Sequence, residues 1–90
     1  MTSAFDQRAG QFKALGHPVR LRIAAGLLRH QCRVGRIVSR LGLPQSTVSQ
    51  HLGILRRAGV IVPERQGVRV CYRIADPELA RLLTRLAGHK

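Results

Sequence analysis

The feature that most constrains this chain is the stretch 44–58, PQSTVSQHLGILRRA. Val48, Leu52 and Leu55 recur at the i, i+4 and i+7 spacing of one helical face, which predicts a helix that buries this stripe. Between them lie small or amide residues without charge, where a solvated helix usually carries Glu and Lys. These residues are Gln45, Ser46, Ser49, Gln50 and Gly53. Such a surface suits the major groove of DNA, where glutamine pairs with adenine edges. It also suits close packing against another protein helix.

The charge of the chain favours a polyanionic partner. The net charge is +12, from 16 Lys and Arg against 4 Asp and Glu, and no acidic residue occurs from Gln7 to Pro63. Fourteen of the cations are arginine, whose planar fork binds phosphate and guanine bidentately. We therefore expect a nearly unopposed positive potential around the stretch 44–58.

Length and composition predict one domain over residues 1–90 with an aliphatic core. Hydrophobic residues make up 44% of the chain and aromatic residues 3%. A single copy of this size is marginally stable, which favours a homodimer. The sequence has no apolar run of about 18 residues, no signal peptide and no lipidation motif, so we expect a soluble cytoplasmic protein without membrane association. Two cysteines without a secretory segment fit a reducing compartment.

Enzymatic activity is not expected. The chain has four carboxylates, no phosphate-binding glycine loop and no nucleophile paired with a base. We assign no catalytic residue and no cofactor.

The order of elements predicts a mainly helical fold with a small β wing. A first helix capped by Ser3 ends at Gly16, and a second opens at His17 and Pro18. A link over 31–34 precedes a helix over 35–41, and the turn 42–44 leads into the stretch 44–58, as in a helix-turn-helix. Strands over 60–65 and 69–74, joined by a turn at 66–67, form a hairpin. Asp76 and Pro77 begin a last helix.

The first and last helices have apolar stripes that the helix-turn-helix does not use. Such a stripe covers either its own domain or a second copy of the chain. We expect pairing of two copies through the two terminal helices. The residues predicted at this interface are Phe5, Phe12, Leu79, Leu82, Leu83 and Leu86.

Three strings of the sequence resemble the ArsR/SmtB family of bacterial winged helix-turn-helix repressors. They are FKALGHPVRLRI over 12–23, LGLPQSTVSQHLGILRRAGVI over 41–61 and GVRVCYRI over 67–74. The resemblance implies a homodimeric repressor of about five helices plus a hairpin that binds operator DNA and releases it when an inducer, unknown here, binds. The charge alone also allows a non-specific nucleic-acid or chromosome-associated protein.

The resemblance assigns DNA-binding roles to individual positions. It implies a groove-facing group on the long helix, a phosphate contact from its far end, and phosphate or minor-groove contacts from the wing. The three sets are Gln45, Ser46, Thr47, Ser49 and Gln50; Arg56; and Arg65 and Arg69. Pro44 replaces the serine that the family often has, which removes a side-chain cap. The operator is expected to be an imperfect palindrome with half-sites about one helical turn apart.

The family's usual metal sites are not expected in this chain. The string at the third helix, QCRVGR over 31–36, has one cysteine followed by two arginines instead of two cysteines one residue apart. The last helix carries Arg81, Thr84 and Arg85 where Asp and His ligands would be needed. His51 is expected to pack within the helix-turn-helix. We predict no metal site.

Cys32 and Cys71 are 39 positions apart but can meet in a winged helix, where the link before the third helix can pair with the returning strand of the wing. In that strand Val70, Tyr72 and Ile74 alternate with Cys71 and two arginines, and cationic neighbours favour a reactive thiolate. One interpretation is a dithiol switch that responds to an oxidant, a reactive sulfur species or a soft ion. The other is that both are small buried hydrophobes.

Overall fold

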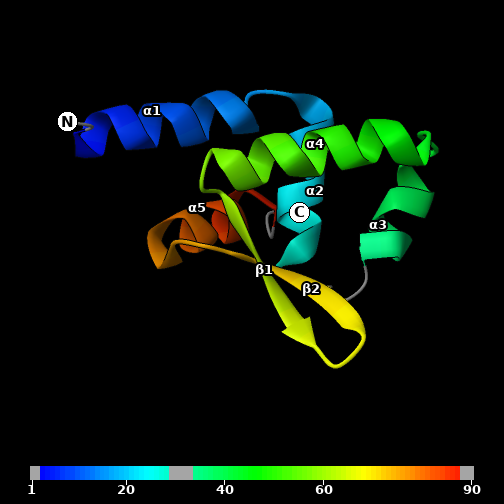
Figure 1. Ribbon diagram of the computed structural model, residues 1–90. Helices are drawn as coiled ribbons and strands as arrows, with labels where there is room; N and C mark the ends of the chain where they lie inside the picture. Colours follow the sequence, from blue (N-terminus) through cyan, green and yellow to red (C-terminus); the bar gives the residue numbers. More distant parts are fainter. Residues whose placement is uncertain (1–2, 29–33, 88–90) are drawn as a thin grey trace.

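Helices and a hairpin follow one another in the predicted order. The computed structural model describes residues 3–28 and 34–87. Its elements are α1 (Ala4–Leu15), α2 (Pro18–Leu27), α3 (Val34–Leu41), α4 (Gln45–Arg57), β1 (Ile61–Gln66), β2 (Arg69–Ile74) and α5 (Pro77–Ala87). Figure 1 shows α3 and α4 joined by a tight turn, with the hairpin following α4. The predicted class, a winged helix-turn-helix with five helices and a hairpin, is confirmed for the described residues.

Side-chain caps fix the starts of the first two helices. The Ser3 hydroxyl accepts a hydrogen bond from the Asp6 backbone N–H at 3.1 Å, and the Ser3 N–H donates to Asp6 Oδ2 at 3.3 Å. This reciprocal capping box satisfies two backbone donors. At α2, His17 Nδ1 accepts from the Val19 N–H at 3.1 Å, and Pro18 takes the first helical position. Both starts lie where the sequence predicts them.

Residues in turns set the two ends of α4. Gly42 (φ 64°) and Gly59 (φ 78°) adopt left-handed conformations before and after α4, which glycine does at little cost. Pro44 precedes α4 without any side-chain cap bond, as the departure from the family pattern predicts. At α5, Asp76 Oδ1 accepts from the Glu78 N–H at 2.8 Å.

The core is aliphatic and draws on every helix and both strands. Gly26 lies against Ile37, because a Cβ at Gly26 would be 3.1 Å from Ile37 Cδ1, so the missing side chain lets α2 and α3 approach closely. The largest fully buried side chains are Ile23, Leu27, Leu55, Val60, Ile61, Leu79 and Leu83. Burying this apolar surface is the main favourable contribution to folding.

The hairpin is a two-stranded antiparallel sheet whose boundaries differ from the prediction by one residue. Ile61 lies opposite Ile74 at one end and Gln66 opposite Arg69 at the other, with the turn at 67–68. Val60 is outside the strand because its N–H donates to the Leu55 carbonyl at 2.9 Å, which ends α4. The third helix likewise begins one residue earlier than predicted, at Val34. The rest of the predicted link, residues 31–33, lies outside the described residues.

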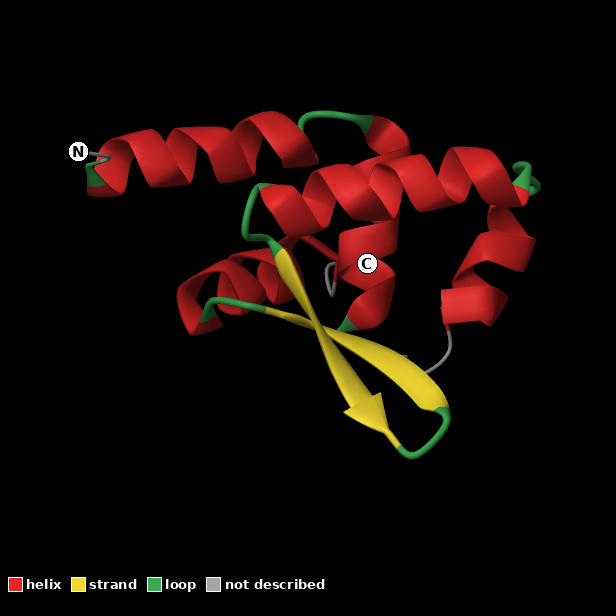
Figure 2. Cartoon of the chain, in the orientation of Figure 1, coloured by secondary structure: helices red, strands yellow, loops and turns green. Residues whose placement is uncertain are grey.

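Burial along β2 does not follow its simple alternation. Cys71, which alternation places on the face of the two arginines, is 2% exposed, in agreement with the interpretation as a small buried hydrophobe, whereas Val70 on the opposite face is 43% exposed. Figure 2 shows the hairpin as a strongly twisted ribbon that projects beyond the helices. Val70 lies opposite Arg65, in the second residue pair from the turn. A strict two-residue period therefore does not tell which side of this strand is covered.

The apolar stripes of the terminal helices divide between the core and the surface. Leu79 and Leu83 are 2% and 1% exposed and belong to the core of the same chain, so their predicted place at a dimer interface is not supported. Four other predicted residues are open in the single chain: Phe5, Phe12, Leu82 and Leu86, at 86%, 51%, 39% and 62% exposed. Figure 1 shows α1 and α5 toward one end of the molecule and α3 at the other.

Candidate nucleic-acid interface

The long helix α4 is anchored by the apolar stripe that the sequence predicts. Val48 and Leu55 are 2% and 0% exposed, and Leu52 is half-buried. With this stripe buried, α4 turns its amide and hydroxyl groups outward. Gln45, Ser46, Ser49 and Gln50 are exposed, whereas Thr47 is half-buried. The face offered to a partner thus has hydrogen-bonding capacity but no charge.

A polar cluster holds the middle of α4 against the start of α2. Arg20 Nη1 lies 3.3 Å from His51 Nδ1, and Arg20 Nε donates to the Ala14 carbonyl at 2.6 Å. The rings of His51 and His17 are tilted, with centroids 4.8 Å apart. Burial, followed by the nearby His17 and Arg20, lowers the pKa of His51 below 6.5. Because arginine can only donate, Nδ1 of His51 acts as the acceptor, and a neutral ring suits this place.

Cations near α4 are left without carboxylate partners. Arg56 at the end of α4 and Arg65 in the wing are exposed, and neither has an ion-pair or hydrogen-bond partner for its side chain among the described residues. The backbone of Arg69 lies opposite Gln66, while its side chain is outside the described part of the chain. All four carboxylates are engaged elsewhere: Asp6 with Ser3, Glu64 with Arg73, and Asp76 and Glu78 with Arg8. The predicted positive surface is therefore not neutralised around α4.

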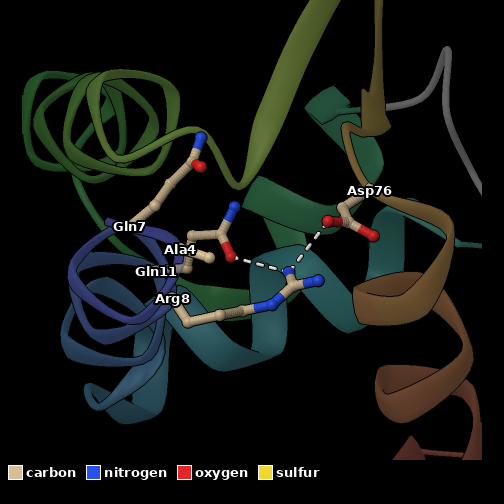
Figure 3. A pocket seen from close by; sticks show the side chains of 5 residues that line it. All are labelled: Ala4, Gln7, Arg8, Gln11 and Asp76. Atoms are coloured by element: carbon tan, nitrogen blue, oxygen red, sulfur yellow. Dashed lines mark hydrogen bonds and ion pairs between the residues drawn. The ribbon is translucent and has the colours of Figure 1, made fainter. Parts of the chain in front are cut away.

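A polar junction ties α1 to both α4 and α5. Arg8 Nη1 donates to Gln11 Oε1 at 2.9 Å and lies 2.8 Å from Asp76 Oδ2 at the start of α5 (Figure 3). Gln11 is 4% exposed, and its Nε2 donates to the Gly59 carbonyl just after α4 at 3.2 Å. A hollow of about 120 Å³ lies beside this junction, lined by Ala4, Gln7, Arg8, Gln11 and Asp76. The helix expected to pair in a dimer thus contacts the end of the recognition helix.

Of the two cysteines, the structure describes only Cys71. Cys71 is buried in β2 and is disulfide-bonded, whereas Cys32 lies outside the described residues. Arg73 of the same strand is half-exposed and paired with Glu64 at 2.5 Å, so it does not provide the unpaired cation that was expected to make Cys71 reactive. No group of three or more potential metal ligands occurs among the described residues.

Three functional features were not anticipated from the sequence. Arg20 and His17 support His51 across the interface between α2 and α4, Gln11 bridges α1 to Gly59, and Tyr72 faces α4 from the wing. The first two depend on contacts between distant segments, which leave no periodic signal in the chain. Tyr72 was predicted only as an inward-facing strand residue.

An uncharged hydrogen-bonding helix face after a tight turn, flanked by a hairpin and by unpaired arginines, defines a winged helix-turn-helix DNA-binding protein. The family model described as "Bacterial regulatory protein, arsR family" matches residues 17–62, just over half of the chain. The chain belongs to this family of transcriptional regulators.

Individual relatives of this chain are also transcriptional regulators or winged helix-turn-helix domains. An uncharacterized HTH-type transcriptional regulator of Mycobacterium tuberculosis, Rv0081, is 46% identical over 80 residues, which is 88% of this chain and 70% of the relative. The crystal structure of the transcriptional repressor PagR of Bacillus anthracis has a TM-score of 0.80 and 37% identity, covering 92% of this chain and 95% of that one. The homodimeric winged helix-turn-helix DNA-binding domain of Mb0332 from Mycobacterium bovis has a TM-score of 0.77 and 33% identity, covering 93% and 78%.

In residues 3–28 and 34–87, no helix combines the length and the apolar character that crossing a membrane requires.

Proposed function

We propose that this protein is a homodimeric repressor that binds an imperfectly palindromic operator and is released from it by an inducer. The observation that carries this proposal is the surface of α4, whose apolar stripe is buried. The helix exposes Gln45, Ser46, Ser49 and Gln50 near Arg56, which has no ion-pair partner among the described residues. Amides and hydroxyls at this place suit base edges in the major groove. The arginines supply phosphate contacts, which fix register without reading sequence. Its role is binding rather than catalysis.

Pairing of two chains follows from the surface of α1 and α5. Phe5 and Leu86 are 86% and 62% exposed, so in a single chain these large apolar side chains face water. A second copy that covers these side chains would also double the DNA contacts. Two α4 helices related by a twofold axis would then enter successive major grooves about one helical turn apart. The relatives' printed descriptions as a repressor and as a homodimer support this arrangement.

The proposal is tested by selecting bound DNA from a genomic library and measuring affinity for base-substituted versions of the selected site. Gln50→Ala should change preference at one base pair per half-site by roughly tenfold or more, because one good base contact contributes about 1–3 kcal/mol. Its salt dependence should stay unchanged, since Gln50 neutralises no phosphate. Gln7→Ala, an exposed glutamine on α1, is the matched control. Unaltered preference in Gln50→Ala, or equal binding to random DNA, would reject sequence-specific recognition through α4.

For release, we propose a thiol switch between Cys32 and Cys71. The buried place of Cys71 in the wing and its disulfide-bonded state support this proposal. Disulfide formation releases two protons and two electrons, which a peroxide accepts as it is reduced to water. Operator affinity should then differ between oxidised and reduced protein, and Cys71→Ser should show no such difference. Equal affinities of the oxidised and reduced wild-type protein would rule the switch out.

A further inference from the structure

A hollow of about 170 Å³ lies where the recognition helix meets the wing. It is lined by Ser49, Leu52, Gly53 and Arg56 of α4 and by Tyr72 of β2. Ser49 and Arg56 are exposed, so the hollow opens on the side of α4 that carries the proposed DNA contacts. Its volume exceeds the roughly 30 Å³ that one water occupies in the liquid, so there is room for a small oxyanion group.

The polar groups around this hollow are suited to an anion. The Arg56 guanidinium can only donate hydrogen bonds, and the hydroxyls of Ser49 and Tyr72 can donate as well. Among the described residues none of these three side chains has a hydrogen-bond or ion-pair partner. No carboxylate lines the hollow. Three available donors with one fixed positive charge therefore converge on one space.

Gly53 allows a second cation to lie close by. A Cβ at Gly53 would be 3.2 Å from Arg57 Nη1, so the Arg57 guanidinium lies over the helix surface that a side chain would otherwise cover. The positive potential at the hollow is thus the sum of two neighbouring guanidinium groups.

We propose that this hollow binds one phosphodiester of the DNA backbone, held by Arg56, Tyr72 and Ser49. The proposal rests on the proposed function and adds a defined phosphate site to it. Because Ser49 and Arg56 belong to α4 and Tyr72 to β2, a single phosphate bound here bridges the recognition helix and the wing. Binding then fixes the position of the wing relative to α4, and a change in that position separates the donors.

The test uses the selected operator with one neutral methylphosphonate placed in turn at each backbone position of a half-site. In the wild-type protein, one position should lower affinity about tenfold, the order expected for losing hydrogen bonds to a charged group. In Tyr72→Phe, which removes only the hydroxyl, the same methylphosphonate should have a clearly smaller effect. Arg56→Gln should show the same coupling and reduce the salt slope by about 0.9 per site. Arg85→Gln, an exposed cation in the last turn of α5, is the control that should show no coupling to that position.

The outcomes distinguish this site from the proposed function. If no phosphate position is coupled to Tyr72 or Arg56 while the wild-type protein still selects its operator, the phosphate site is wrong and the regulator proposal stands. If the wild-type protein binds random DNA as tightly as the operator, the proposed function itself fails. Coupling of one position to Tyr72 and Arg56, but not to Arg85, establishes the site. Circular dichroism melting of each variant shows that its fold is retained.

Discussion

The polar junction between α1 and α4 predicts a large loss of stability from a single glutamine. Gln11 is 4% exposed, accepts from Arg8 at 2.9 Å and donates to the Gly59 carbonyl at 3.2 Å. Gln11→Leu keeps a side chain of similar size but removes both hydrogen bonds. The Gly59 carbonyl then loses its partner in a partly buried place, while Arg8 keeps its two carboxylates.

The expected loss of folding free energy comes mainly from the Gly59 carbonyl, because Arg8 keeps its other partners. One lost hydrogen bond plus an unsatisfied, partly buried acceptor destabilises a protein by about 1–3 kcal/mol. For a domain of this size, each kcal/mol lowers the thermal midpoint by roughly 4–8 °C. Urea unfolding followed by circular dichroism measures the change directly. Wild type and variant are compared at equal concentration, because the proposed dimerisation would make stability depend on concentration.

Gln7 provides a matched control one turn earlier on α1. It is exposed, and its side chain makes no hydrogen bond within the described residues. Gln7→Leu should therefore change the free energy of unfolding by no more than about 0.5 kcal/mol. If Gln11→Leu and Gln7→Leu are equally stable, the hydrogen bond from α1 to the end of α4 does not contribute, and the reasoning is refuted.

Four further predictions address other parts of the structure. Because the fold lowers the pKa of His51, the unfolded chain binds more protons than the folded chain as the pH falls below about 6.5. The free energy of unfolding should therefore decrease as the pH is lowered from 6.5. Urea titrations of His51→Gln should show a smaller decrease than those of the wild type. Phe5→Ser combined with Leu86→Ser should shift the protein from dimer to monomer in sedimentation velocity and weaken operator binding, and an unchanged dimer would contradict the proposed interface. Leu55→Ala should cost about 2–5 kcal/mol in urea unfolding, because this fully buried side chain leaves a cavity. Gly53→Ala should stabilise α4 by up to about 1 kcal/mol in helix propensity and yet weaken DNA binding, measured by melting and by fluorescence anisotropy.

Local chemistry made most of the fold predictable. Ser3, His17 with Pro18, and Asp76 act at the positions where the sequence places them, because caps depend on neighbouring residues. The burial of Val48 and Leu55 likewise follows from spacing along a single helix. These signals are complete within a few residues, so the chain alone carries them.

The errors occur where the outcome depends on a distant element. Val70, in the second residue pair from the turn, is 43% exposed, whereas Cys71 is buried on the strand face that alternation gives to the arginines. Leu79 and Leu83 face the core of their own chain, although spacing could not separate them from the exposed Leu82. For the candidate site, helix spacing identified the outward residues of α4, but the approach of Tyr72 to Arg56 required the position of the wing.

The placement of charge explains how a chain with a net charge of +12 can distinguish one DNA sequence from another. Arginine contacts to phosphate act alike on every duplex, so they raise specific and non-specific affinity together and largely cancel in the ratio of the two. Discrimination must come from uncharged groups that meet base edges, and we propose that Gln50, which is exposed on α4, is one of them. Gln50→Ala should therefore lower the ratio of operator to random-DNA affinity, whereas Arg56→Gln should weaken both affinities and leave the ratio nearly constant. Competition binding at two salt concentrations measures both quantities, and a ratio that collapses in Arg56→Gln but not in Gln50→Ala would assign recognition to the arginine instead.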